Sequence, residues 1–119
     1  MPSDRSDVGR WLADIRHNIA LAENFTAGVA YDDFKDDVLR LYAVIRCLEI
    51  ISEASRRLPD DLKARHPSIA WQGMAGAGSV YRQDCEDVAP SLVWVVLQDH
   101  LPPLHIVVEQ ELAAIDNRG

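Results

Sequence analysis

Apolar residues recur every three or four positions along most of this chain, the spacing that places side chains on one face of an α-helix. In the first such series the apolar positions are Val8, Leu12, Ile15, Ile19 and Ala22. Ser6 and Asp7 suit the beginning of a helix, and Gly28 suits the region just after its end. The pattern therefore predicts a helix from about Asp7 to about Asn24.

A second and longer series follows, with apolar residues at spacings of four, three, four and three. Its positions are Phe34, Val38, Leu41, Ile45 and Leu48. Asp32 and Asp33 suit the positive end of a helix, and Arg56 and Arg57 suit its negative end, so one helix is predicted over 32–57. Further apolar residues on this helix indicate that neighbours contact it from two sides. They are Val44, Ile51 and Ala54.

Proline and glycine divide the rest of the chain. The segment Pro59–Arg65 is typical of a single helical turn opened by proline, and a third helix is expected to begin near Ile69. Its middle, Gly73–Gly78, is rich in glycine and alanine, which indicates a close approach to a neighbouring helix. We expect a fourth helix from Pro90, then a rigid hinge over 101–104 and a fifth helix. The apolar stripe of the fifth helix consists of Leu104, Val108 and Leu112.

The run 92–97 is rich in β-branched residues, and a strand is the competing prediction for it. A lone strand would have no partner, because no other stretch of the sequence has a strand-like pattern. The 119 residues fit one domain, and no linker, repeat or low-complexity segment divides them. The sequence therefore predicts an all-α fold, a single domain over 1–119 built as an up-and-down helical bundle of about five helices.

Charge and composition restrict the function classes. The formal net charge of −7 disfavours non-specific binding of nucleic acid, which depends on clustered Lys and Arg, although a local basic cleft remains open. Cys47 and Cys85 lack the spacing of metal-binding cysteines. The histidines His17, His100 and His105 fall in different helices, so no metal and no cofactor are expected. No signal peptide or apolar stretch of about 20 residues is visible, which predicts a cytoplasmic protein that does not span a membrane.

Several motifs follow one another in a fixed order. Tyr31–Phe34 resembles a Tyr-x-x-Phe entry to a long helix, and Ala43–Ala54 resembles the signature Ala-Val-x-Arg-x-Leu-x-Ile-Ile-Gly-Glu-Ala, with Ser52 at the glycine. His66–Trp71 resembles His-Pro-x-Ile-Pro-Trp, and Val93–Trp94 followed by 101–104 resembles the remainder of the same pattern. The ordered set covers nearly the whole chain and resembles the HepT-like toxins of the HEPN superfamily.

The resemblance implies a helical toxin of a bacterial two-gene toxin–antitoxin system. Toxins of this family are metal-independent ribonucleases or closely related RNA-directed proteins. They usually form homodimers, and the active cleft lies between the protomers. The cognate antitoxin resembles a minimal nucleotidyltransferase, which can attach AMP to a tyrosine of the toxin.

The family's active motif is Arg-Asn-x-x-x-His-x-Tyr on the third helix. Histidine can move a proton at the ribose 2′-hydroxyl or the leaving oxygen, and arginine can stabilise the phosphate charge through paired hydrogen bonds. In this chain the corresponding residues are Gly78, Ser79, Gln83 and Cys85, and none of them matches. Some members carry Gly-Asn-x-x-Arg-His-x-Tyr instead, and against that version Gly78 and Arg82 are retained.

Glutamine has no titratable group, so Gln83 predicts weak or absent ribonuclease activity. Arg82 can hold a phosphate, or it can be a surface arginine or one paired with a glutamate such as Glu53. Glu53 and Arg46 are candidates to support the same cleft, and the alternative for Glu53 is an exposed glutamate on a helix. Cys85 replaces the tyrosine that an antitoxin would modify. Three interpretations remain: a working ribonuclease, a catalytically dead module that binds RNA or a nucleotidyltransferase partner, and a purely structural helical dimer.

The cations near the end of the second helix could attract RNA phosphates or could be ordinary helix-end cations, and we favour the second interpretation. They are Arg56, Arg57, Lys63, Arg65 and His66.

Overall fold

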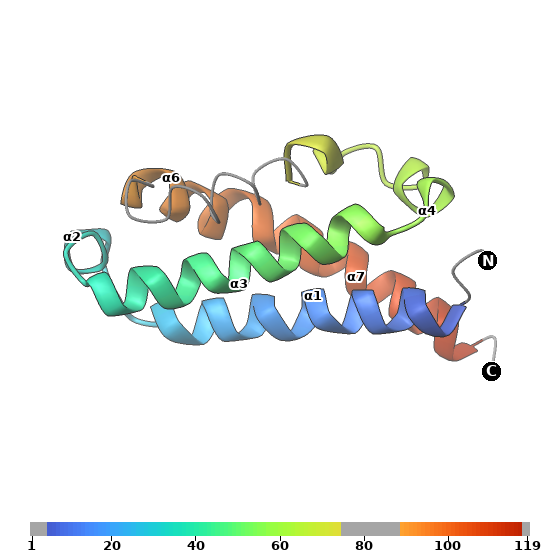
Figure 1. Cartoon of the computed structure of the whole chain (residues 1–119), viewed down its shortest axis with the longest axis horizontal. Coiled ribbons are helices and arrows are strands. Elements are labelled where there is room, and N and C mark those ends of the chain that lie inside the picture. The colour runs from blue at the N-terminus through green and yellow to red at the C-terminus, as the bar shows by residue number, and fades with distance from the viewer. Residues whose placement is uncertain (1–4, 75–88, 118–119) are drawn as a thin grey trace.

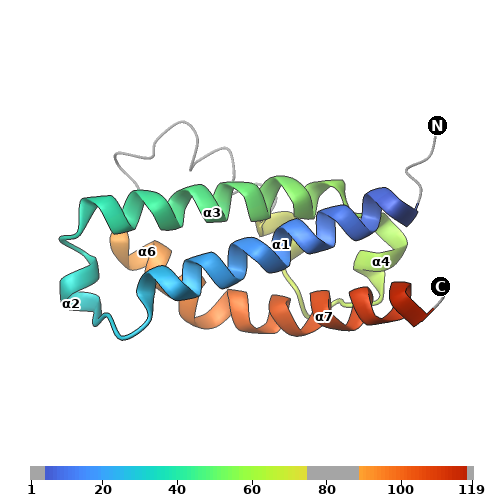
Figure 2. The same cartoon turned by 90° about the horizontal axis from the view of Figure 1, so that it is seen from below.

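Three long helices lie alongside one another in the computed structural model of the chain, which describes residues 5–74 and 89–117 (Figures 1 and 2). They are α1 (Arg5–Thr26), α3 (Val38–Arg57) and α7 (Leu101–Asn117). Helix α1 packs against both α3 and α7, and the described ranges contain no strand. The predicted all-α bundle is therefore confirmed.

The core lies between the long helices and is built from the apolar series that the sequence shows. The side chains of Leu12, Ile15 and Ile19 on α1 are fully buried, as are Val44 on α3 and Val108 on α7. The second apolar side predicted for α3 is also confirmed, because Ile51 and Ala54 are buried. Burial of these side chains supplies most of the favourable free energy of folding.

The first helix is longer than predicted and runs from Arg5 to Thr26. Its last residue closes the final turn, because the Thr26 hydroxyl donates to the Ala22 carbonyl oxygen at 2.9 Å. Gly28 follows with a φ of +72°, a backbone conformation that favours glycine. The predicted role of Gly28 just after the helix is confirmed.

The prediction of a single helix over 32–57 is wrong, because the structure divides it into α2 (Tyr31–Phe34) and α3. Asp37 separates the two helices, and its carboxylate accepts a hydrogen bond from the Arg40 backbone N–H at 3.0 Å. A capping carboxylate satisfies an amide that has no partner at a helix start, so it favours a new helix here. As a consequence Val38, predicted on the apolar stripe, is 60% exposed.

The end of the bundle that carries α2 is held by aromatic contacts. The Trp94 ring lies 5.6 Å from the Tyr31 ring and 5.1 Å from the Phe34 ring, centroid to centroid. Trp94 belongs to α6 (Pro90–Val95), in which Pro90 occupies the first turn as predicted. These contacts join α2 and α6, and the helical prediction for 92–97 is confirmed.

The rigid hinge predicted over 101–104 is absent, and the chain stays helical from α6 into α7. A π-helical turn, Val96–His100, links them, and the Leu101 N–H bonds to the Val96 carbonyl. Pro102 and Pro103 then lie in the first turn of α7. Proline cannot donate a backbone hydrogen bond and crowds the carbonyl one turn earlier. The wider π turn places these prolines without ending the helix.

The continuous helical run Pro90–Asn117 is 28 residues long and has a mean hydropathy of 1.2 over its most apolar window. By length and composition alone it could cross a membrane, but the core helix of a soluble protein meets the same criterion. Within α7 this run contributes Leu104 and Val108 to the core. A single helix of this kind is a weak indication, and the expected absence of a membrane span stays a prediction.

Candidate functional site

The five positions of the expected active motif lie outside the described residues. They are Gly78, Ser79, Arg82, Gln83 and Cys85. The structure does describe the helical start of the segment that leads to them, residues 71–74, and the helix α3 on which that start packs. The candidate site can therefore be described from this start, from α3 and the turn that follows it, and from the hollows that the described residues line.

Helix α3 is joined to the start of the motif-bearing segment by a hydrogen bond. The Ser52 hydroxyl donates to the Met74 carbonyl oxygen at 2.7 Å, and Ser52 is only 3% exposed. Ser52 is also the position at which the family signature has glycine. A glycine could not make this bond, so the departure from the signature adds a direct link between the two elements.

An apolar pocket of about 180 Å³ lies beside this hydrogen bond. Its wall combines α3, the residues just before the motif, and the π-helical turn. The lining residues include Leu48, Ile51, Gly73, Met74, Val96 and Leu101. Among the lining residues that the structure describes, the polar side chains are those of Ser52 and His100, and one imidazole without a described partner acid or base makes a poor catalytic centre.

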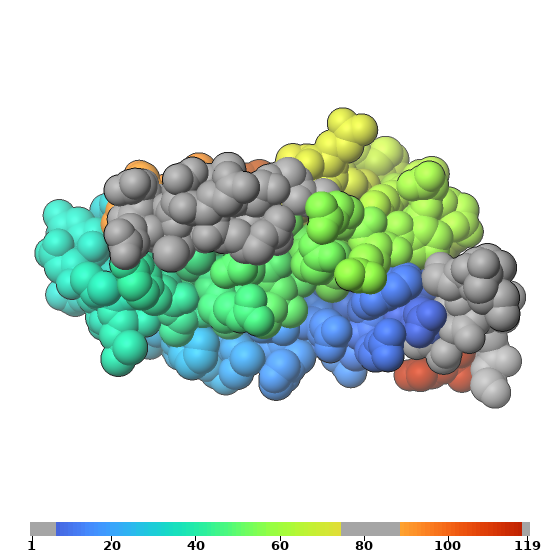
Figure 3. Space-filling model, viewed as in Figure 1, coloured from blue at the N-terminus to red at the C-terminus, as the bar shows by residue number. Residues whose placement is uncertain are grey.

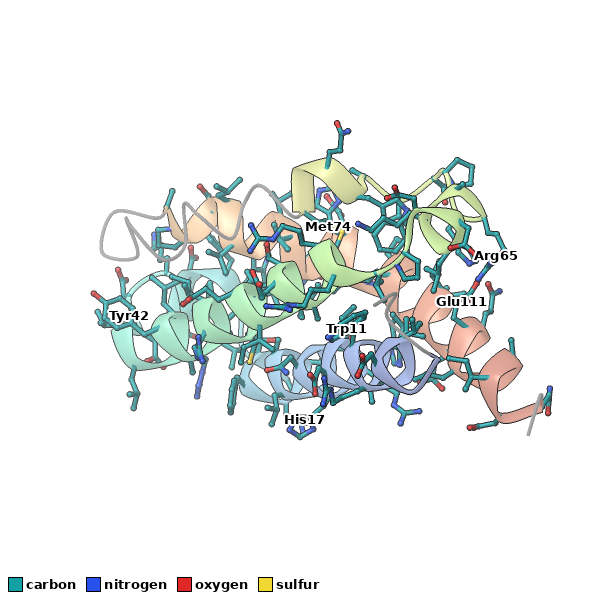
Figure 4. The ribbon with its side chains drawn as sticks, turned by 45° about the vertical axis from the view of Figure 1, so that its right-hand side comes forward. Trp11, His17, Tyr42, Arg65, Met74 and Glu111 are labelled. Carbon is teal, nitrogen blue, oxygen red and sulfur yellow. The ribbon has the colours of Figure 1, made fainter. Side chains whose placement is uncertain are left out.

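A second hollow, of about 470 Å³, lies between α1 and α3, and we call it the α1–α3 groove. Both residues that the sequence placed in a supporting cleft, Arg46 and Glu53, line it. The structure therefore brings this predicted pair to one groove. The half-buried Trp11 contributes from α1 and lies between the two helices in Figure 4.

The charged side chains of α3 in this groove pair along their own helix. Arg46 lies 3.4 Å from Glu49, and Glu53 pairs with both Arg56 and Arg57, the latter at 3.2 Å. Ion pairs this exposed contribute little to stability. The predicted pairing of Glu53 with Arg82 stays a prediction, because Arg82 lies outside the described residues.

Within residues 5–74 and 89–117, the buried charged residue is Glu111 of α7. It joins α7 to the turn after α4 (Asp60–Ala64), and we call Arg65, His66 and Glu111 the Glu111 cluster. The Glu111 carboxylate accepts from Arg65 at 2.8 and 3.2 Å and lies 2.6 Å from His66 Nε2. Figure 4 shows Arg65 and Glu111 pointing toward each other. The Arg65 hydrogen bonds lower the pKa of Glu111 despite its burial, and the same bonds raise the pKa of Arg65.

Trp71 fixes the same turn from the other side. Its indole N–H donates to the carbonyl oxygens of Lys63 and His66, both at 3.1 Å. The turn that carries His66 and Pro67 is thus held by α7 through Glu111 and by the start of the motif-bearing segment through Trp71. The His-Pro motif has a structural role in positioning that segment.

The cations near the end of α3 are paired within the chain. Arg56 and Arg57 contact Glu53, the Lys63 ammonium donates to the Arg56 carbonyl oxygen at 3.3 Å, and Arg65 contacts Glu111. These pairings support the interpretation of this set as helix-end cations. Glu111 was missed as a functional partner because it lies 46 residues from Arg65, and no local pattern marks the pair.

Cys47 is a buried free thiol, 3% exposed, as expected for a small apolar residue. Burial raises the pKa of its thiol, which keeps it in the unreactive protonated form. Across residues 5–74 and 89–117, no group of three or more His, Cys, Asp or Glu side chains could hold a metal ion.

Comparison with known proteins identifies the family to which the sequence is similar. Residues 15–111 match the family model described as Ribonuclease HepT-like. The chain is 37% identical over 94 residues to a probable ribonuclease HepT of Thermococcus cleftensis, covering 79% of this chain and 86% of the relative. It is 30% identical over 105 residues to a putative RNase of Methanocaldococcus jannaschii, covering 88% and 96% of the two chains. No solved structure matches the chain significantly.

Proposed function

The chain belongs to the ribonuclease HepT-like family, and from this premise we propose that it is a toxin-family protein of a toxin–antitoxin system with weak or absent ribonuclease activity. One observation carries the proposal: Gln83 stands where the motif that the sequence resembles has histidine. The relatives' names support ribonuclease ancestry. The glutamine at position 83 indicates that this chain has lost most or all of that ribonuclease activity.

Metal-independent RNA cleavage requires a group that takes a proton from the ribose 2′-hydroxyl or gives one to the leaving oxygen. Histidine suits this role because it titrates near neutral pH, whereas the amide of Gln83 accepts and donates hydrogen bonds without changing its protonation state. Proton transfer by a positioned side chain contributes about 10²- to 10⁴-fold to a rate. Without a proton-transferring side chain, the chain is expected to retain at most the rate enhancement that Arg82 provides by holding the phosphate.

The described residues favour a scaffold that still binds. Arg46 and Glu53 line one groove, Ser52 bonds to the start of the motif-bearing segment, and the Glu111 cluster holds the preceding turn. A module that binds RNA or a nucleotidyltransferase antitoxin needs this arrangement and does not need the histidine. Such a module is the alternative function.

A second copy of the chain is the partner that we propose first. The first two turns of α3 expose large apolar side chains, with Val38 at 60%, Leu39 at 84% and Tyr42 at 42%. Exposed apolar groups that gather on one element often mark an interaction surface. We place the homodimer in the cytoplasm, where RNA would be available to it.

The test is growth on induced expression of the wild-type protein beside a triple revertant, Ser79→Asn with Gln83→His and Cys85→Tyr. Arrest by the revertant alone supports a toxin scaffold that has lost its chemistry. Adding Arg82→Ala to the revertant is the control, and it should relieve the arrest. Arrest by the wild-type protein at equal expression would overturn the proposal.

The antitoxin half has its own test. Co-expression with a nucleotidyltransferase encoded beside this chain should give a stable complex. Because Cys85 replaces the tyrosine, incubation of that complex with ATP should leave the intact mass of this chain unchanged, while the Cys85→Tyr variant gains one AMP. A gain of AMP by the wild-type chain would show that another residue, such as Tyr81, is modified.

A further inference from the structure

We propose that the α1–α3 groove binds a single unstacked nucleotide of RNA, with the base against Trp11 and the phosphate at the arginines of the rim. The choice of RNA as ligand rests on the proposed function. The placement rests on the groove itself.

The groove has the volume and the apolar base that a nucleotide requires; we call this apolar base the floor of the groove. Its volume of about 470 Å³ falls in the range of roughly 300–1,000 Å³ that is usual for small-molecule sites. Trp11, Ile50 and Ala54 provide apolar surface at the junction of the two helices. Figure 3 shows α1 in blue and α3 in green side by side on this face of the molecule. Stacking of a base on an aromatic side chain typically strengthens binding by roughly 5- to 150-fold.

Three guanidinium groups surround this floor. The side chains of Arg10, Arg46 and Arg57 are 69%, 68% and 56% exposed. Each pairs with a carboxylate three or four residues away on its own helix, and such exposed pairs are weak. A phosphate can therefore replace the carboxylate, since the planar guanidinium matches its oxygens with two parallel hydrogen bonds.

Three carboxylates also line the groove, those of Asp14, Glu49 and Glu53. They balance the three arginines, so the groove is not the continuous basic surface that a long nucleic acid follows. Carboxylates accept hydrogen bonds from the exocyclic amino group of a base, and Glu49 is the most enclosed of the paired ones, at 18% exposed. The chemistry fits one nucleotide that carries an amino group, namely A, C or G, and disfavours U.

The experiment is fluorescence anisotropy of end-labelled pentaribonucleotides A5, C5 and U5 titrated with the full-length chain. We expect A5 and C5 to bind more tightly than U5. The affinity should fall about tenfold in Trp11→Ala and in Arg46→Ala, and Trp11→Phe should keep most of it. The logarithm of affinity should fall with the logarithm of salt concentration at a slope no steeper than about −2, because each phosphate contact on a single strand contributes about −0.7.

A matched control is Arg16→Ala, which removes another exposed arginine of α1 that pairs with Glu109 away from the groove. Its binding should equal that of the wild type. Equal losses in Arg16→Ala and Arg46→Ala would overturn the proposal, as would unchanged affinity in Trp11→Ala or the absence of binding at millimolar protein. Dissociation of a dimer by Arg46→Ala, with no effect on the residual affinity for A5, would also overturn it and assign the groove to a subunit interface.

The outcome is distinguishable from that of the proposed function because no catalysis is measured. Binding in the groove together with a non-toxic triple revertant would uphold this inference and reject the toxin proposal. A toxic triple revertant, together with normal A5 binding by Trp11→Ala and Arg46→Ala, would uphold the toxin proposal and reject this inference.

Discussion

Glu111 of α7 accepts two hydrogen bonds from the guanidinium of Arg65, one at 2.8 Å and one at 3.2 Å. The two residues are 46 positions apart, and their contact fixes the turn after α4 on the last helix. That turn leads directly to the segment that carries the family's motif. The position of the turn that precedes residues 71–74 therefore depends on a charged contact with the last helix.

Replacement of Glu111 by glutamine should destabilise the protein. The glutamine side chain has one acceptor oxygen and one NH2 donor, so one of the two acceptor oxygens that bind Arg65 and His66 would be lost, and the remaining bonds would be made to a neutral acceptor. Hydrogen bonds to charged groups contribute about 1.5–3 kcal/mol. Because Arg65 is 47% exposed, solvent screening reduces this, and we expect a loss of about 1–2 kcal/mol in the free energy of unfolding, measured by urea denaturation.

Glu109→Gln provides the matched control on the same helix. Glu109 is 50% exposed and contacts Arg16 at 3.5 Å, so its replacement should change stability by no more than about 0.5 kcal/mol. Equal losses in the two variants would show that the Glu111 cluster has no special role.

The contribution of Glu111 should depend on pH in one direction. Its pKa in the folded protein is lowered from 4.5, first by the hydrogen bonds from Arg65. A carboxyl group whose pKa is lower in the folded state stabilises the protein above the unfolded pKa, and this contribution is lost as the pH falls through the folded pKa. The stability difference between wild type and Glu111→Gln should thus be full near neutral pH and shrink below pH 4.5. A difference that stays constant into strong acid would contradict this assignment.

Two buried serines one turn apart on α3 should respond oppositely to the same substitution. The Ser52 hydroxyl bonds to the Met74 carbonyl, so Ser52→Ala should cost about 1 kcal/mol. The Ser55 hydroxyl is buried with no hydrogen-bond partner within residues 5–74 and 89–117. Ser55→Ala removes an unsatisfied group and favours the helix, so it should stabilise the protein by about 0.5–1 kcal/mol. Thermal and urea unfolding would measure the stability change in each variant. Destabilisation by both Ser52→Ala and Ser55→Ala would contradict the predicted opposite effects.

Hydrophobic spacing was sufficient to predict the bundle, because burial of one face is what holds each long helix in place. It was insufficient at Asp37, where a capping carboxylate divides what the spacing joins into one helix. It also failed at Pro102 and Pro103, because a π-helical turn accepts prolines that normally mark a break. Both errors come from local hydrogen bonding, to which the apolar pattern is insensitive.

Fewer features of the candidate site than of the fold could be predicted from the sequence. Gln83 at the histidine position of the resembling motif was read from the sequence alone and stays a prediction. Arg46 and Glu53 line one groove, and their support of the active cleft also stays a prediction, because the motif lies outside the described residues. The partnership of Glu111 with Arg65 and the approach of Trp11 to α3 were not predictable, because both depend on how distant helices pack. Tertiary contacts of this kind leave no periodic signal in one sequence.

The central claim is that Gln83 marks the loss of the proton-transferring group, and cleavage of a labelled RNA by purified protein tests it most directly. A Ser79→Asn, Cys85→Tyr double variant, which keeps Gln83, is the control and should gain little over the wild type. The account predicts that the Ser79→Asn, Gln83→His, Cys85→Tyr revertant cleaves without added metal, and that the wild-type chain is slower by about 10²-fold or more. Equal cleavage rates for the wild type and the revertant would contradict the claim.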